Sequence, residues 1–429
     1  MVLSLLTLLA LWSGPAAAAE DAAPPSEAWL SESYTLEDAV AIALKNDSRL
    51  LSAEQDRIIA SERVTEAKLV FLPEFGLQAS ATKFDARYPF ALSQDFRNLL
   101  LFPGAPQNIY SGRGYMHFPI YEGGRSINTL RLAQAALKAA QSNYESVKMD
   151  VELAVKEAFY RLLQAQETLA SATDAAVEAQ RLAADLQGGP WDRIEAEGLS
   201  EQARRRGAEA LRELTLRRLG FLKAINRELG TSFRVLGRLE PQPSEVDAQK
   251  ASLWAIEMRP ELQSETYKAE MDAIAVNLAS SRRYPTLFLG GDYELTAQRF
   301  PLRNNNWDFG VGIKIPLTYD FITKLRQRRA EQRQGQLKRA ALQDQVRLEV
   351  RQACEHLAYW KLESALRGRQ HRLVSDVYGK AAPAAAPSLA KLRARMTVLD
   401  MSLTYLEAVA EHSLARARLE RAVGRDLAP

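Results

Sequence analysis

The residue types that usually carry catalysis or bind metals are few and scattered in this chain of 429 residues. No Gly-x-Ser-x-Gly or phosphate-loop pattern is present, and Gly123-Gly124 is not followed by the Gly-Lys-Ser/Thr of a nucleotide loop. The histidines lack the spacing of metal ligands; they are His117, His356, His371 and His412. The sequence therefore predicts that the chain is not an enzyme and has no metal site and no cofactor.

The only cysteine and the overall charge further limit the classes of protein to which the chain could belong. Cys354 has no second cysteine with which to form an internal disulfide, and it lies far from the N-terminus, where a lipid-anchor cysteine would stand. A buried position on a helix is favoured for it over a reactive thiol. The formal net charge of +3 gives no reason to expect nucleic acid as a partner.

The first residues have the character of an export signal. Residues 1–19 carry no charge and end in an Ala-x-Ala pattern, although the usual basic start is missing, and an Ala-, Pro- and Ser-rich flexible leader is expected over 20–33. After the signal peptide, no run of about 18 uncharged apolar residues remains. Hydropathy therefore excludes transmembrane helices, but it does not exclude membrane insertion as strands.

Four segments alternate apolar and polar residues with a period of two, which predicts strands at about 74–84, 112–120, 286–298 and 307–317. A polar set is expected to face a watery lumen: Gln78, Ser80, Thr82, Arg113, Tyr115, Asp292, Glu294, Asp308 and Lys314. An apolar set is expected to face lipid: Phe75, Leu77, Met116, Phe118, Leu287, Leu289, Phe309, Val311 and Ile313. The alternative is a soluble β-sandwich with one wet face, which is disfavoured because little of the chain remains to cover the apolar face.

Very long helices separate the strand pairs. Residues 125–187 contain neither proline nor glycine, and at ~1.5 Å per residue this run would reach ~90 Å as a helix. Long helices are predicted at about 125–187, 192–229, 322–380 and 388–423. Alanine-rich heptads on the first of them suit a wall of helices packed side by side, and an ordinary antiparallel coiled-coil hairpin is the alternative.

The whole arrangement occurs twice. Leu50 precedes Pro73 by the same interval as Leu262 precedes Pro285, an offset of 212 residues (262 − 50 = 212). The predicted organisation is a first repeat at 34–230, a linker at 231–251 and a second repeat at 252–429. Four strands cannot close a membrane barrel, so the chain must oligomerise. Three copies would supply twelve strands, and four copies would also close.

Short motifs in matching positions of the two repeats resemble the TolC-type outer membrane efflux proteins over essentially the whole chain after the signal peptide. These motifs are Tyr34–Leu44, Leu72-Pro73, Pro119–Arg125, Arg259–Leu262 and Tyr284–Leu287. The resemblance implies a mixed α and transmembrane β fold: a homotrimer with a twelve-stranded barrel in the bacterial outer membrane, continued by a periplasmic α-helical coiled-coil barrel.

The same resemblance implies a function and partners. The chain would be the passive exit duct of a tripartite efflux pump or type I secretion system, in contact with outer membrane lipid, a periplasmic adaptor protein and an inner-membrane pump. The helix breaks would be the periplasmic tips that contact the adaptor, with Gly188, Gly189, Asp192, Gly379 and Lys380. At the second tip an Ala/Pro stretch replaces the usual family motif.

The competing class is a soluble or surface-bound periplasmic coiled-coil interaction protein. Membrane fractionation followed by mass measurement in mild detergent distinguishes the two classes. The assignment of the strand faces has its own test: a charge at Val311 or Ile313 is expected to harm assembly, whereas a charge at Gly312 is expected mainly to alter conductance.

Overall fold

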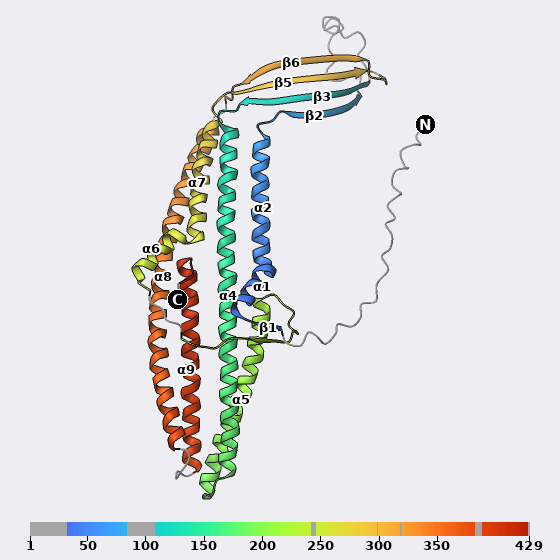
Figure 1. The fold of residues 1–429 in the computed structure, drawn as a ribbon. Coiled ribbons are helices and arrows are strands. Elements are labelled where there is room, and N and C mark those ends of the chain that lie inside the picture. Colours follow the sequence, from blue (N-terminus) through green and yellow to red (C-terminus); the bar gives the residue numbers. More distant parts are fainter. Residues whose placement is uncertain are drawn as a thin grey trace, which may run out of the picture.

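The computed structural model describes residues 32–83, 108–241, 246–297, 299–317, 320–381 and 388–427. A curved four-stranded sheet lies at one end of an elongated molecule, and the long helices run from it to the opposite end (Figure 1). The predicted signal peptide and the long loop between the first two strands lie outside the described residues.

Two matching series of elements make up the fold. The first is α1 (Leu36–Asn46), α2 (Ser48–Leu69), β2 (Glu74–Lys83), β3 (Asn108–Tyr121), α4 (Arg125–Ala184) and α5 (Pro190–Ala224). The second is α6 (Ala248–Met258), α7 (Pro260–Ser281), β5 (Thr286–Ala297), β6 (Asn304–Lys314), α8 (Asp320–Ala381) and α9 (Ser388–Val423). The helices α1 and α6 are separated by the offset seen in the sequence (248 − 36 = 212), as are α2 and α7.

Local hydrogen bonds explain why the first two helices begin where they do. The Thr35 hydroxyl accepts from the Asp38 N–H, and the Asp38 carboxylate accepts from the Thr35 N–H, each at 3.2 Å, so a capping box starts α1. Asp47 then ends α1 and caps α2 by accepting from the Arg49 N–H at 2.8 Å.

The longest helices, α4 and α8, are the ones against which the other helices of each repeat pack. α2 packs beside the half of α4 nearer the sheet and α5 beside the other half, while α7 and α9 are arranged in the same way along α8 (Figure 1). Alanines occupy many of the buried positions where α4 meets its neighbours near the far end, including Ala172, Ala175 and Ala179. Small side chains let these long helices approach closely along their length.

The last helix of each repeat, α5 or α9, is followed by a residue in the left-handed backbone conformation. That residue contacts the end of the first short helix, α1 or α6. After α5, Asn226 has φ of 53° and its side chain donates to the Asn46 carbonyl at 2.6 Å. After α9, Gly424 has φ of 83° and packs on the backbone of Met258 and Arg259. A Cβ at residue 424 would lie 3.2 Å from the Arg259 nitrogen, so glycine suits this position.

Two segments predicted to be irregular contain regular structure. β1 (Glu32–Tyr34) begins within the expected flexible leader 20–33, and it pairs in parallel with β4 (Phe233–Val235), within the expected linker 231–251. The linker region also contains the start of α6. The prediction failed here because strands of three residues are too short for alternation to be recognised, and their partner is remote in sequence.

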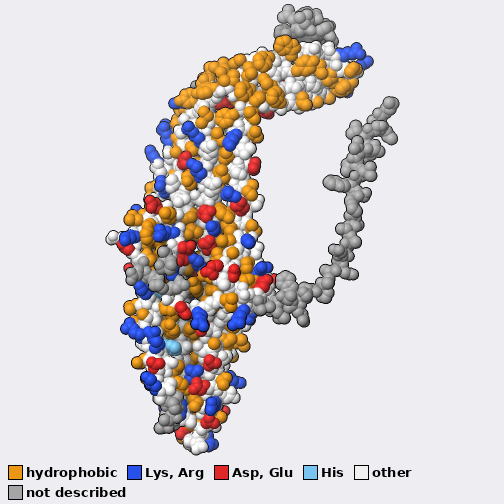
Figure 2. Space-filling view, in the orientation of Figure 1, with side chains coloured by type: hydrophobic (Ala, Val, Ile, Leu, Met, Phe, Trp, Pro, Cys, Tyr) orange, Lys and Arg blue, Asp and Glu red, His pale blue; other side chains and the backbone are white. Residues whose placement is uncertain are grey.

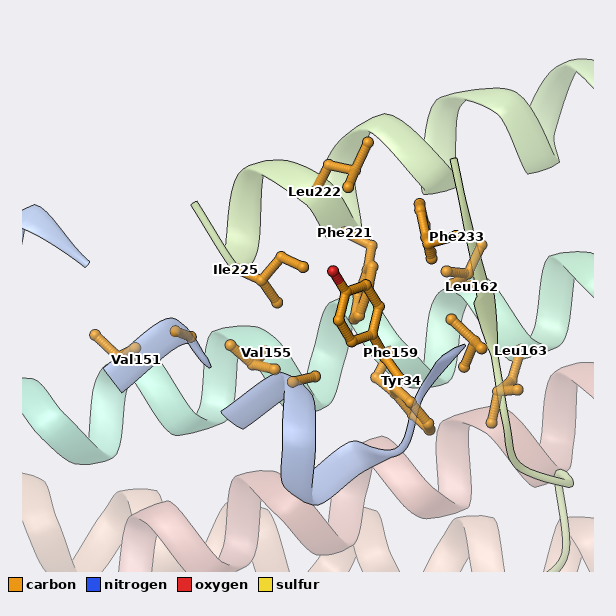
Figure 3. Close-up of a cluster of buried hydrophobic side chains, with 13 residues drawn as sticks. Tyr34, Val151, Val155, Phe159, Leu162, Leu163, Phe221, Leu222, Ile225 and Phe233 are labelled. Atoms are coloured by element: carbon orange, nitrogen blue, oxygen red, sulfur yellow. The ribbon is translucent and has the colours of Figure 1, made fainter. Parts of the chain in front are cut away.

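The β1–β4 pair is held by an aromatic core (Figure 3). Tyr34, Phe159, Phe221 and Phe233 are buried together, with ring centroids 5.3 Å apart for Phe221 and Phe233 and 5.9 Å apart for Tyr34 and Phe233. These rings belong to β1, α4, α5 and β4, so the core joins the chain entering the first repeat to the chain leaving it. Burial of large aromatic side chains is a major stabilising contribution.

Among the described residues, none of the helices combines the length and apolar character needed to cross a membrane as a helix.

Candidate functional site

The four-stranded sheet has the order β2-β3-β5-β6, so β2 and β6 are its edges. Its antiparallel registers determine which residues share a face, because directly paired residues point to the same side. Gln78 pairs with Arg113, Arg113 with Glu294, and Asp292 with Asp308. All nine residues of the expected lumen set lie on this one face, and all nine of the expected lipid set lie on the other. Which face meets water and which meets lipid stays a prediction.

The polar face carries an ordered charge cluster towards the edge strand β6. Arg113 forms an ion pair with Asp292 at 2.8 Å, and Ser111 donates to the Glu294 carboxylate at 2.5 Å. Asp308 lies directly across from Asp292 on the neighbouring strand. The remaining expected lumen residues are spread along the same face: Gln78, Ser80, Thr82, Tyr115 and Lys314. Among the described residues, no group of three or more His, Cys, Asp or Glu side chains is placed to hold a metal ion.

The apolar face is exposed along both edge strands. Leu77 is 93% exposed and Trp307 is 75% exposed, and Phe75, Phe309, Val311 and Ile313 are exposed as well. Figure 2 shows hydrophobic side chains gathered over the sheet, whereas charges are mixed along the helices. Monomeric soluble proteins rarely expose contiguous apolar patches beyond a few hundred Å². This face therefore requires a covering partner or a lipid environment.

Aromatic rings lie over glycines in direct cross-strand pairs. Tyr115 covers Gly76 and Phe288 covers Gly312 on the polar face, while Phe309 covers Gly291 on the apolar face. A Cβ at any of these glycines would collide with the ring. Such pairs fill the space that a glycine leaves on a strand and fix the register.

This packing corrects one expectation about the polar face. Any side chain at Gly312 must displace the Phe288 ring, whose centroid also lies 5.0 Å from that of His117. A charge at Gly312 would therefore disturb the sheet as well as the solvent. Gly310 is on the same face, and a Cβ there would meet no atom within 4 Å. It is the better position for placing a charge.

Gly123 and Gly124 form the corner between β3 and α4. Their φ angles are 63° and 81°, in the left-handed region that favours glycine. A Cβ on Gly123 would also lie 2.7 Å from the Tyr284 Cβ and 2.9 Å from the Ser281 carbonyl oxygen. The corner thus packs the exit of the first hairpin against the entrance of the second.

The first helix tip has the predicted composition and a defined structure. α5 begins at Pro190, and the Asp192 carboxylate folds back to accept from the Gly189 N–H at 3.1 Å. A Cβ at Gly188 would lie 2.9 Å from this carboxylate, so glycine leaves room for it. Beside it, Trp191 is 82% exposed.

The second tip follows α8, which ends at Ala381, close to the predicted end at about 380. Gly379 and Lys380 lie in the last turn of this helix, and their contact with an adaptor stays a prediction. A single glycine costs a helix only about 1 kcal/mol relative to alanine, and the packing of α8 along α9 outweighs this. Residues 382–387 lie outside the described residues.

Side chains near the tips connect the two repeats. The Tyr378 hydroxyl of α8 donates to Glu178 of α4 at 2.5 Å, and Arg395 of α9 pairs with the same carboxylate at 2.6 Å. Burial, followed by the hydrogen bond to Glu178, raises the pKa of Tyr378, so the phenol remains protonated. Arg393 of α9 adds two contacts of 2.6 Å to Glu195 of α5.

A second connection between the repeats is largely buried. Arg421 of α9 pairs with Glu261 of α7 and with Asp150 of α4, the latter at 2.7 Å. Burial raises the pKa of Glu261, but the hydrogen bond and charge of Arg421 outweigh burial and hold this pKa below its ordinary value of 4.5. The carboxylate is therefore ionised throughout the physiological range.

Sequence reasoning missed these connections and Trp191. A tryptophan directly after Gly-Gly-Pro at a helix start was a usable signal, because a large apolar side chain at a chain reversal has little to pack against. No comparable signal marked Glu178 and its partners, since they are about 200 positions apart in the sequence.

The fold is that of outer membrane channel proteins. A Pseudomonas aeruginosa membrane protein matches with a TM-score of 0.76 at 16% identity, covering 91% of this chain and 93% of that one. The MtrE outer membrane channel of Neisseria gonorrhoeae gives 0.75 at 16% identity, covering 91% and 89%. The CmeC outer membrane channel of Campylobacter jejuni gives 0.71 at 15% identity, covering 91% and 85%.

Residues 39–187 match the family described as outer membrane efflux protein. Over these residues the match confirms the resemblance drawn from the sequence. A search of curated protein sequences found no significant match.

Proposed function

We propose that this chain is the outer membrane export channel of a tripartite efflux pump or type I secretion system, a passive and non-enzymatic conduit. The observation that carries the proposal is the exposed apolar face of a sheet whose opposite face is polar and charged. Such a sheet suits a barrel wall with lipid on one side and a water-filled lumen on the other. The match to outer membrane efflux proteins supports the same assignment.

The two sheet edges require assembly with further copies. Within the described part of the chain, β2 and β6 have no strand partner on their outer sides, and hydrocarbon does not tolerate an open edge. In a cyclic assembly, β2 of one copy pairs with β6 of the next. Geometry alone admits three or four copies, and the family resemblance favours three, which makes a barrel of twelve strands.

The helices continue the conduit into the periplasm, and their tips meet the partners. The first tip, with Gly188, Gly189 and Asp192, contacts a periplasmic adaptor that links the channel to an inner-membrane pump. Gly379 and Lys380 line the second tip, in the last turn of α8. A soluble coiled-coil role is disfavoured because it leaves the apolar face of the sheet without a cover.

Fractionation and mass measurement test this proposal. The protein is expected in the outer membrane fraction, and after extraction in mild detergent its mass should correspond to three chains. Inserted in a planar lipid bilayer, it should conduct ions without an energy source. A monomer recovered in the soluble periplasmic fraction would contradict the channel function.

A further inference from the structure

A cavity of about 650 Å³ lies where α6 meets α8 and α9, well below the sheet. Its volume falls within the range of ~300–1,000 Å³ typical of small-molecule sites. Apolar side chains form its floor, namely Trp254, Leu357, Leu419 and Leu427. The cavity is therefore suited to an apolar body of modest size.

The charges around this floor are mostly positive. Four cations line the cavity: Lys250, Lys361, Arg416 and Arg425. The one acidic residue in the lining is Asp247, and its carboxylate accepts from the Gln249 N–H at 2.9 Å as the cap of α6. Arg416 is paired with Glu420 at 3.3 Å. Lys250 and Arg425 form no ion pair with any residue in the described part of the chain.

Arg425 is held in place by an aromatic ring. Its guanidinium lies 4.1 Å from the centroid of Trp254, a cation–π contact. A guanidinium stacked in this way keeps its planar edge of N–H donors available, and that edge matches the two oxygens of a carboxylate. The rim of the cavity thus holds a positioned anion receptor next to an apolar floor.

A second cavity elsewhere in the molecule provides a comparison. Its volume is also about 650 Å³, and it lies where the α1–α2 corner meets α4, α5 and Arg418 of α9, with several arginines in its lining. These arginines are neutralised by carboxylates: Arg49 by Asp47, Arg161 by Glu411, Arg217 by Glu213 and Arg418 by Glu157. The arginines of that cavity are thus already paired with carboxylates. At the offset of 212 residues, Lys250 and Trp254 of α6 correspond to Asp38 and Ile42 of α1, so this cation and this ring have no counterpart in the first repeat.

We propose that the cavity beside α6 binds a small amphipathic carboxylate. Its apolar body lies against Trp254, Leu357 and Leu419, and its carboxylate is bound by Lys250 and Arg425. The ligand contacts α6, α8 and the segment after α9 together, so its binding stabilises the second repeat. This site does not depend on whether the chain conducts solutes.

Equilibrium dialysis of radiolabelled octanoate against the purified full-length protein in a neutral detergent tests the site. Saturable binding of one octanoate per chain is expected. The double variant Lys250→Gln with Arg425→Gln should bind about tenfold more weakly. Arg351→Gln is the matched control, because Arg351 is an exposed cation of α8 outside the cavity lining, and its binding should equal that of the unmodified protein.

Cys354 reports where the ligand is bound. This thiol lines the same cavity, and it is the only cysteine of the chain. Octanoate should slow its alkylation by N-ethylmaleimide, while octanol, which has the same chain and no charge, should not. The proposal is overturned if octanoate shows no saturable binding, if the double variant binds as well as the control, or if octanol competes equally. The assembly mass of each variant identifies any that fail to fold.

Discussion

The turn from β3 into α4 depends on the backbone conformation of Gly123. Its φ of 63° is unfavourable for residues with a Cβ, and its surroundings leave no space for one, because Tyr284 and the Ser281 carbonyl approach from the second repeat. From its sequence alone, a glycine pair before a helix could be required or merely tolerated. Only the contact across the repeats decides that it is required, and that contact joins residues about 160 positions apart.

Replacing Gly123 with alanine should therefore destabilise the protein by ~1–3 kcal/mol. Gly198→Ala is the control, because Gly198 lies within α5 and a Cβ there would meet no atom within 4 Å. The control should stabilise by ~0.5–1 kcal/mol, since alanine favours a helix over glycine. Thermal unfolding of the detergent-solubilised assembly measures both, and equal midpoints for the two variants would disprove the requirement.

Glu261 should make the stability of the folded protein depend on pH in the acidic range. Its pKa in the folded protein is below 4.5, so its contribution is fully present above that value and is lost as the pH falls through the folded pKa. Glu261→Gln should cost ~1–3 kcal/mol at neutral pH, because Arg421 loses a charged partner in a largely buried position. The difference from the unmodified protein should shrink below pH 4.5.

The control for this pH dependence lies one turn further along α7. Glu265 has one ion pair among the described residues, with Lys268 of the same helix at 2.7 Å, so Glu265→Gln should change stability by less than ~0.5 kcal/mol. Thermal midpoints of the three proteins across an acid titration make the comparison. A constant difference for Glu261→Gln at every pH would show that its effect is steric.

At the scale of elements, the periodicity of apolar residues predicted the features that depend on local sequence, namely the strands of the sheet and the long helices. Alternation separated the two faces of every strand of the sheet, because each strand repeats its environment every second residue. The same reasoning could not reveal that Phe288 covers Gly312, since this contact depends on the register between β5 and β6. It also missed β1 and β4, whose pairing depends on an aromatic core assembled from four separate elements.

The two faces of β6 can be tested with a matched pair of charges. Val311→Asp places a carboxylate on the exposed apolar face, where lipid contact would make it cost up to ~2 kcal/mol, and the yield of the assembly should fall. Gly310→Asp places the same charge on the polar face with space for its Cβ, so the assembly should form and its cation selectivity should rise. Yields of the assembly in detergent and reversal potentials in bilayers measure the outcomes. Equal loss of assembly would mean that the faces are assigned wrongly.

At the scale of the whole molecule, the internal duplication allowed the architecture to be predicted from the sequence. The contacts between the two repeats could not be predicted in this way. The offset of 212 residues identified two equivalent units (260 − 48 = 212), and helix length gave their elongated shape. Near the tips an apolar cluster of α4, α5 and α9 joins the units, and ion pairs and hydrogen bonds between surface residues of the long helices join them further. Charged residues occur all along these helices, so their sequence does not indicate which of them meet.

These connections lead to a prediction about opening of the conduit. A tip that opens must separate the α4–α5 pair from the α8–α9 pair, and Glu178 holds both Tyr378 and Arg395 across that boundary. Glu178→Ala removes both contacts, worth ~1–3 kcal/mol together, so the open population should rise by about tenfold. Glu201→Ala is the control, because the ion pair that Glu201 forms in the described structure is with Arg204 of the same helix, at 2.8 Å. Single-channel recordings in bilayers should show a larger open fraction for Glu178→Ala alone, and an equal change in both variants would assign the effect to lost surface charge rather than to the released tip.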